Sequence, residues 1–265
     1  MSRKHGMWRS AVLALALGGM LVGCASTLSN VGTTFQKGRD AQGHYDTGKA
    51  KYDAGEYAGA IPHFQRTLFL DPKYDDAEAY LAWSFYHLGN YPEATSHFRQ
   101  VVARQPRWEG VWNGLGWSRY RAERYHLAIE AFQEAVSLDP RYRDAAVGLA
   151  YSYFELGWYA EALPHLERLT REGEGHIFQS AAADVEEVRA RTAWCLYYVG
   201  EYEKARAKFA EGLRAHPDLY GLHSGLGWTY LKLGDRVKAR ESFQRALRLK
   251  PDYADARSGL AQAGR

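Results

Sequence analysis

The sequence predicts an all-α solenoid of six repeats, each 34 residues long and folded as helix–turn–helix. Three observations support this fold class. Prolines recur 34 residues apart, in one run of three and one of two: Pro72, Pro106, Pro140, and then Pro217 and Pro251. When repeats begin at residues 41, 75, 109, 143, 186 and 220, position 20 is always alanine: Ala60, Ala94, Ala128, Ala162, Ala205 and Ala239. Position 24 is phenylalanine in five repeats and Leu166 in the fourth. A repeat of this size cannot bury its apolar face alone, so neighbouring repeats must stack.

The composition agrees with a folded chain and argues against two classes, disordered chains and nucleic-acid-binding proteins. Of 265 residues, 46% are hydrophobic and 14% aromatic, which excludes a disordered chain. The net charge of +3 comes from Arg3, Lys4 and Arg9, because without them 31 basic residues face 31 acidic ones. Nucleic-acid binding needs clustered positive charge, so no nucleic-acid partner is expected.

Residues 1–23 have the pattern of a secretory signal peptide. The basic residues precede an apolar run, Ala11 to Leu17, which is too short to span a bilayer. The run ends in Leu-Val-Gly before Cys24, which resembles the lipobox of bacterial lipoproteins. That resemblance implies cleavage after residue 23 and acylation of Cys24. The alternative is an uncleaved anchor, or an ordinary signal peptide with an incidental cysteine.

The residues after Cys24 bear on location and on reach. Ala25, rather than aspartate, favours the outer membrane in hosts that sort lipoproteins by this residue. We therefore expect a lipid-anchored protein of the bacterial envelope that faces the periplasm. Residues 24–40 are rich in Ser, Thr and Gly and are expected to form a flexible tether.

The repeat register divides the remaining chain. The expected repeats are 41–74, 75–108, 109–142, 143–176, 186–219 and 220–253, with an insertion at 177–185 and a capping helix at 252–265. The insertion is either a tolerated loop or an added contact surface. Position 15, at the turn between the two helices, is glycine except for Glu123 and should need a left-handed backbone. Pro62 and Pro164 fall inside the second helix of their repeats and should delay or bend it.

This pattern of small, aromatic and proline positions over residues 41–251 resembles the tetratricopeptide repeat (TPR) family. The resemblance implies a right-handed superhelix in which the first helix of each repeat, the A helix, lines the concave face. Positions 2, 5, 9, 12 and 13 would point into that groove. The second helix, the B helix, would lie on the convex side.

The expected groove carries two rows of aromatic residues, three positions apart on one helix face. Position 9 provides Trp83, Trp117, Tyr151, Trp194 and Trp228, and position 12 provides Tyr86, Tyr120, Phe154 and Tyr197. Two interpretations remain open. The rings either stack on one another and stiffen the solenoid, or they present a binding surface, because aromatic residues are enriched among binding hot spots.

The sequence does not predict an enzyme, a cofactor or a metal site. His63, His97 and His165 share position 23 of different repeats, too far apart to bind one ion. No phosphate-binding loop, HExxH motif or nucleophile elbow is present in the sequence. Cys195 takes a position that is small in the other repeats, so it is expected to be a packed residue.

Two functional hypotheses follow. The first is an envelope scaffold that binds protein partners, similar to the TPR lipoproteins called pilotins that help assemble type IV pilus secretins. The second is a polysaccharide-export lipoprotein whose groove contacts glycan directly. The repeat pattern alone does not decide between them, because it specifies a fold rather than a function.

Overall fold

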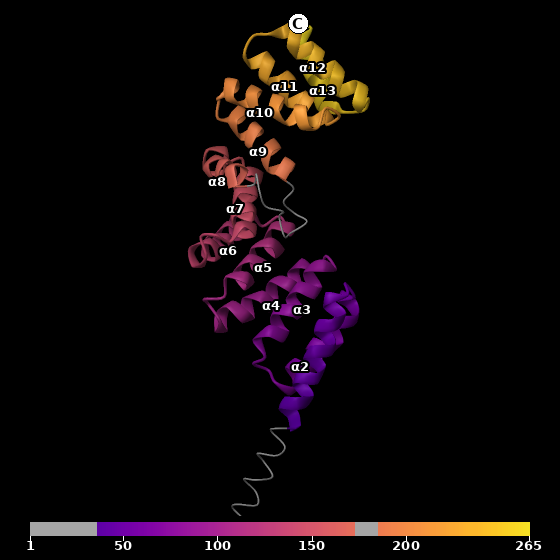
Figure 1. The fold of residues 1–265 in the computed structure, drawn as a ribbon, viewed down its shortest axis with the longest axis vertical. Coiled ribbons are helices and arrows are strands. Elements are labelled where there is room, and N and C mark those ends of the chain that lie inside the picture. Colours follow the sequence, from indigo (N-terminus) through magenta and orange to yellow (C-terminus); the bar gives the residue numbers. More distant parts are fainter. Residues whose placement is uncertain (1–35, 173–184) are drawn as a thin grey trace, which may run out of the picture. The chain divides into compact units, whose positions relative to one another are not determined.

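The structure, a computed structural model, describes residues 36–172 and 185–265. All the regular structure in these two ranges is helical, as Figure 1 shows. The chain divides into two compact units, residues up to His97 and residues from Phe98 onward, and each is described by itself. The signal peptide, Cys24 and residues 177–184 of the predicted insertion at 177–185 lie outside the described residues.

The first unit begins with a helix over residues 36–53, followed by α2 (Tyr57–Leu70), α3 (Asp75–His87) and the start of α4 (Tyr91–Arg104). Residues 36–40, expected to be tether, are therefore part of the first helix. Side-chain hydrogen bonds one turn apart explain this extension. Gln36 donates to Asp40, and Arg39 donates to Gln36.

The second unit continues the same alternation of A and B helices. Its elements are α5 (Glu109–Arg121), α6 (Tyr125–Leu138), α7 (Arg143–Glu155), α8 (Tyr159–Glu172), α9 (Val185–Tyr198), α10 (Tyr202–Ala215), α11 (Tyr220–Lys232), α12 (Arg236–Leu249) and the capping helix α13 (Ala254–Ala263). Each helix packs on the next, and successive A helices also contact one another: α5 with α7, α7 with α9, α9 with α11, and α11 with α13. This order confirms the helical-repeat solenoid.

A left-handed residue ends each A helix at position 15. Gly55, Gly89, Gly157, Gly200 and Gly234 have φ between 74° and 89°. Glu123 takes the same place with φ of 59°, although a side chain disfavours this conformation. The turn geometry is thus set by its place in the repeat, and Glu123 conforms to it without being glycine.

The two prolines inside B helices do not delay those helices. Both α2, which contains Pro62, and α8, which contains Pro164, begin at position 17, as the other B helices do. Each proline is the sixth residue of its helix and removes one internal hydrogen bond, while the first turn before it is complete. The expected late start is therefore wrong.

The core is built around the aromatic ring at position 24. Phe64, Phe132, Phe209 and Phe243 are fully buried. Each of the last three packs against a glycine at position 6 of the following A helix: Gly148, Gly225 and Gly259, where an added Cβ would lie 2.2 to 2.4 Å from the ring. Real Cβ atoms do not approach this closely, so glycine is needed at these three junctions.

The junction between the fourth and fifth repeats differs from these three. Position 24 of the fourth repeat is the smaller Leu166, and position 6 of the next A helix is Arg191 rather than glycine. Arg191 therefore has a side chain at a place where three other junctions have none.

Candidate functional site: the aromatic face of the A helices

The aromatic residues of the A helices form recurring ring contacts in three repeats of the second unit. The position 9 indole meets the position 24 ring edge-to-face, at centroid distances of 5.3 Å for Trp117–Phe132, 5.2 Å for Trp194–Phe209 and 5.3 Å for Trp228–Phe243. Positions 9 and 12 meet in the same way, for example Trp194 and Tyr197 at 5.6 Å. Edge-to-face pairs stabilise beyond the area they bury. These contacts fit the first interpretation, in which the rings stiffen the solenoid, and they leave the binding interpretation open.

Burial divides the predicted groove residues into two classes. Trp117 is 3% exposed and Tyr151 is 2% exposed, so their rings present no open face. The others are partly buried and keep some accessible surface: Trp83, Trp194, Trp228, Tyr86, Tyr120, Phe154 and Tyr197. Trp83 and Tyr86 belong to the first unit, and the remaining residues belong to the second. A binding surface in the second unit would thus centre on the partly exposed rings.

Two of the indole N–H groups are held by an aspartate 27 residues further along the chain. Trp117 Nε1 donates to Asp144 at 2.9 Å, and Asn113 Nδ2 donates to the same oxygen at 2.8 Å. Trp228 Nε1 donates to both oxygens of Asp255, at 3.0 and 3.1 Å. A tryptophan at position 9, followed by an aspartate at position 2 of the next A helix, is the sequence signal for this pairing. For Trp83 and Trp194 the corresponding residues are Gly110 and Gly221.

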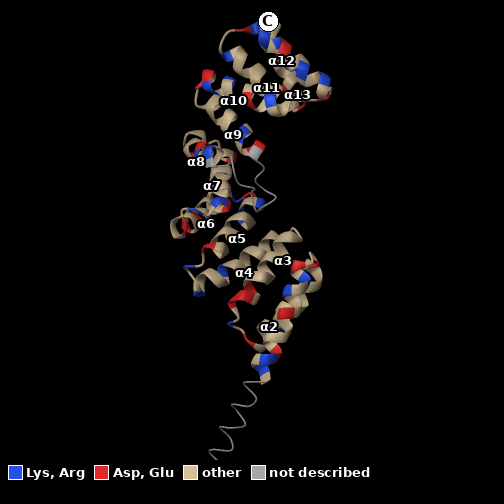
Figure 2. Ribbon diagram, in the orientation of Figure 1, with Lys and Arg blue, Asp and Glu red and all other residues tan. Residues whose placement is uncertain are grey.

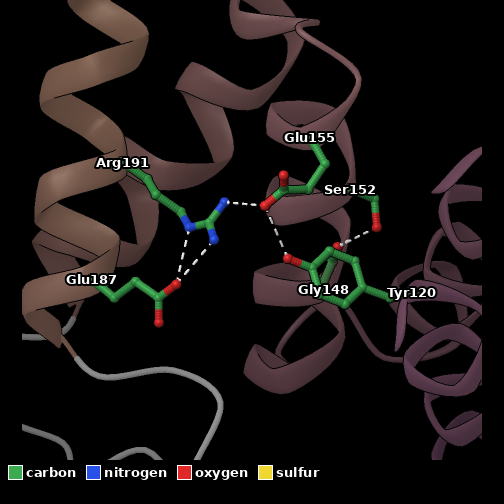
Figure 3. A network of polar contacts seen from close by, with 6 residues as sticks. All are labelled: Tyr120, Gly148, Ser152, Glu155, Glu187 and Arg191. Carbon is green, nitrogen blue, oxygen red and sulfur yellow. Dashed lines mark hydrogen bonds and ion pairs between the residues drawn. The ribbon is translucent and has the colours of Figure 1, made fainter. Parts of the chain in front are cut away.

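Arg191 links two adjacent repeats through a polar network (Figure 3). Its guanidinium donates to Glu155 at 2.8 Å and to Glu187 at 3.0 Å, and Tyr120 donates to the same Glu155 oxygen at 3.2 Å. The guanidinium also lies 4.1 Å from the centroid of Tyr151 and 4.8 Å from that of Phe154. A charge at this depth is stable because it is paired and stacked.

The most exposed ring of this face is not among the residues predicted from the repeat pattern. Tyr198, at position 13 of the fifth repeat, is 51% exposed. Its ring stacks on Tyr159 of the preceding repeat at 4.2 Å and on Trp194 at 5.8 Å. Tyr57 and His87 repeat the first stack in the first unit, also at 4.2 Å. A tyrosine at position 17, followed by tyrosine or histidine at position 13 of the next repeat, is the sequence signal for this stack.

The electrostatic environment of these tyrosines is acidic. Burial, followed by the carboxylate of Asp255, raises the pKa of Tyr198. The same carboxylate contributes to the raised pKa of Tyr197, behind burial and two neighbouring tyrosines. Elsewhere, basic and acidic residues are interspersed along the described helices (Figure 2).

The histidines and the cysteine that were considered for metal binding or reactivity are packed against other side chains of the repeats. His97 Nδ1 lies 2.6 Å from Glu78, and His165 stacks on Tyr153 at 6.0 Å. Burial raises the pKa of the Cys195 thiol to about 12. Across the described residues, no group of three or more His, Cys, Asp or Glu side chains could hold a metal ion. Over the same residues, no helix is long and apolar enough to cross a membrane.

Comparisons with known proteins agree with this geometry. A family model described as a tetratricopeptide repeat matches residues 45–107 and 113–177, and a second model of that description matches 221–253. No curated protein matches the sequence significantly.

Solved structures similar to this chain are themselves helical-repeat proteins. One is YrrB, described as a TPR protein with an unusual peptide-binding site, at 20% identity and TM-score 0.64, covering 74% of this chain and 96% of that one. PilF of Pseudomonas aeruginosa has 20% identity and TM-score 0.64, covering 86% and 99%. MamA AMB-1 has 19% identity and TM-score 0.60, covering 69% and 96%. At these identities, the likeness establishes the fold alone.

Proposed function

We propose that this chain, which belongs to the tetratricopeptide repeat family, is an envelope scaffold that binds protein partners through the A-helix face of its second unit. The observation that carries the proposal is the partly open aromatic surface around Trp194, Tyr197 and Tyr198. Rings that are fixed by stacking lose little conformational freedom on binding, and aromatic residues are enriched among binding hot spots.

The proposal includes a membrane anchor at Cys24 and an outer-membrane location, for which the support is the lipobox-like sequence Leu-Val-Gly-Cys. Several acyl chains on one residue would make attachment stable. A Cys24→Ser variant tests this part. Without acylation the protein should leave the membrane fraction and lose incorporation of an alkyne-labelled fatty acid. Unchanged fractionation and labelling would show that Cys24 is not the anchor.

The partner we propose is a subunit of an envelope machine of the kind served by pilotins, a type IV pilus secretin. Its support is the six-repeat lipoprotein architecture, together with a fold shared with PilF. The groove hypothesis is tested by capturing partners from detergent-solubilised envelopes and identifying them by mass spectrometry. The baits are the intact protein, a Trp194→Ala/Tyr198→Ala variant, and a control.

Trp158→Ala is the matched control, because Trp158 is also exposed (42%) but belongs to the turn before α8 rather than to the A-helix face. Circular dichroism first establishes that each bait is folded. We expect partners to be lost from the double variant and kept by the control. Retention of the same partners by every bait would remove the groove from the proposal, and capture of export proteins instead of a secretin would favour the polysaccharide-export role.

A further inference from the structure

Arg191 lies against a pair of rings whose counterparts one repeat later have glycine in place of the arginine. The filled site consists of the position 9 and position 12 rings of the fourth repeat, Tyr151 and Phe154, with the guanidinium 4.1 and 4.8 Å from their centroids. Glu155 and Glu187 pair with its charge. Within the chain, this junction shows what these rings and carboxylates bind.

In the next junction the same positions are Trp194 and Tyr197, and position 6 of the following A helix is Gly225. Glycine is required there, because a Cβ would lie 2.4 Å from the ring of Phe209. No side chain from that position can therefore cover the two rings. Gly221 stands where the filled site has Glu187, and a Cβ at Gly221 would meet nothing within 4 Å. The neighbouring Tyr198 is 51% exposed.

The charge near this open site is negative. Asp255 accepts hydrogen bonds from Trp228 Nε1 and from the Ser224 hydroxyl, both of which are neutral donors. Among the residues that the structure describes, no lysine, arginine or histidine forms an ion pair with Asp255. Its carboxylate therefore has no cationic partner among these residues, and its charge contributes to the raised pKa of Tyr197 and of Tyr198.

We propose that the surface formed by Trp194, Tyr197 and Tyr198 binds an arginine side chain of the protein partner, with Asp255 supplying the complementary charge. The partner's guanidinium would lie against these rings as Arg191 lies against Tyr151 and Phe154. Arginine fits better than lysine, because its planar, weakly hydrated guanidinium stacks on aromatic faces. The inference rests on the proposed function and specifies what the groove recognises.

The test uses the full chain in detergent with 5-fluorotryptophan in place of tryptophan. The ¹⁹F signal of Trp194 is identified by its absence in Trp194→Phe. Two capped tripeptides are titrated, Gly-Arg-Gly and its citrulline counterpart, which has nearly the same shape without the charge. We expect the arginine peptide to shift the Trp194 signal at a concentration roughly fivefold lower than the citrulline peptide does. The buried Trp117 provides the unshifted reference.

A self-filled variant gives the decisive comparison. Phe209→Leu combined with Gly225→Arg copies the pairing of Leu166 with Arg191, so the new arginine should occupy the site and abolish the peptide response. Phe209→Leu alone should keep it. Asp255→Asn retains acceptor capacity for Trp228 while removing the charge, and should reduce the preference for arginine even if the double variant fails to fold.

Equal responses to the arginine and citrulline peptides would overturn the inference, as would an arginine preference that survives in Asp255→Asn or in a folded double variant. Its failure is distinguishable from failure of the proposed function. If partner capture still depends on Trp194 and Tyr198 while arginine is not preferred, the groove binds protein by other contacts.

Discussion

Gly148 lies directly against the ring of Phe132, so that a Cβ on this glycine would be 2.2 Å from the nearest ring carbon. Gly116 also meets this ring, and a Cβ there would be 2.5 Å from it. One phenylalanine thus fixes the identity of two residues in two successive A helices. The repeat spacing is maintained by this contact.

Gly148→Ala should therefore destabilise the protein by about 1 to 2 kcal/mol, since overpacking outweighs the better helix propensity of alanine. Gly221→Ala is the matched control, another helical glycine with open space around its Cβ. It should leave stability unchanged or raise it slightly. Urea unfolding followed by circular dichroism measures both. Equal stability of the two variants would mean that the A helices separate easily at this junction.

Glu123 has the left-handed φ of 59° that glycine provides in the other repeats. Glu123→Gly should therefore raise the melting temperature, by an amount equivalent to about 1 kcal/mol, because glycine adopts this conformation without the Cβ penalty. The reciprocal change Gly157→Ala should lower it by a similar amount. A destabilised Glu123→Gly would indicate that the carboxylate makes a contact worth more than the backbone strain.

Arg191→Ala should cost about 2 kcal/mol or more, because it leaves Glu155 and Glu187 without their cation and uncovers Tyr151. Arg206→Ala is the control, since its ion pair with Glu203 is solvent-exposed. Such a pair contributes roughly 0 to 1 kcal/mol. Chemical denaturation measures the loss of stability in both variants. Similar losses would show that the Arg191 network stabilises the protein no more than a surface ion pair does.

Cys195 should react with iodoacetamide only after unfolding. Its side chain is fully buried, and burial raises the pKa of the thiol to about 12, so little thiolate is present at neutral pH. Mass spectrometry of the peptide that contains Cys195 gives the extent of alkylation with and without denaturant. Rapid labelling of the native protein would mean that α9 opens locally.

The repeat register predicted the fold because each constraint acts within 34 residues. Alanine at position 20, phenylalanine at position 24 and the position 15 turn were all visible in the sequence, and each is found at the packing point expected for it. The failed expectations came from the helix interior. Pro62 and Pro164 were expected to delay or bend their helices, and the delay is wrong because each proline follows a complete first turn.

Which aromatic rings of the groove are exposed was harder to predict than the fold, because the exposure of each ring depends on residues of the neighbouring repeats. Trp117 and Trp194 occupy the same repeat position, yet the first is buried and bonded to Asp144 while the second has Gly221 opposite it. The residue 27 positions away therefore decides whether the indole N–H has a carboxylate partner, although Trp228, which has one, stays partly exposed. Arg191 likewise follows the smaller Leu166 in the preceding repeat, a pairing that no single repeat shows.

His165 should make the protein less stable in mild acid. Burial, assisted by the nearby charge of Arg168, lowers the pKa of this imidazole in the folded state, so the unfolded chain binds the proton more tightly. The stability that the neutral ring provides is therefore complete above the unfolded pKa of about 6.5 and is lost as the pH falls through the lower folded value.

His165→Phe should flatten that part of the pH profile, because phenylalanine can keep the stack on Tyr153 but binds no proton. The measurement is the melting temperature of both proteins between about pH 7.5 and 5, relative to their values at the upper limit. The melting temperature of the wild type should fall further on acidification than that of the variant. If the two profiles run parallel, protonation elsewhere controls acid sensitivity, and the half-buried imidazole is accommodated in both charge states.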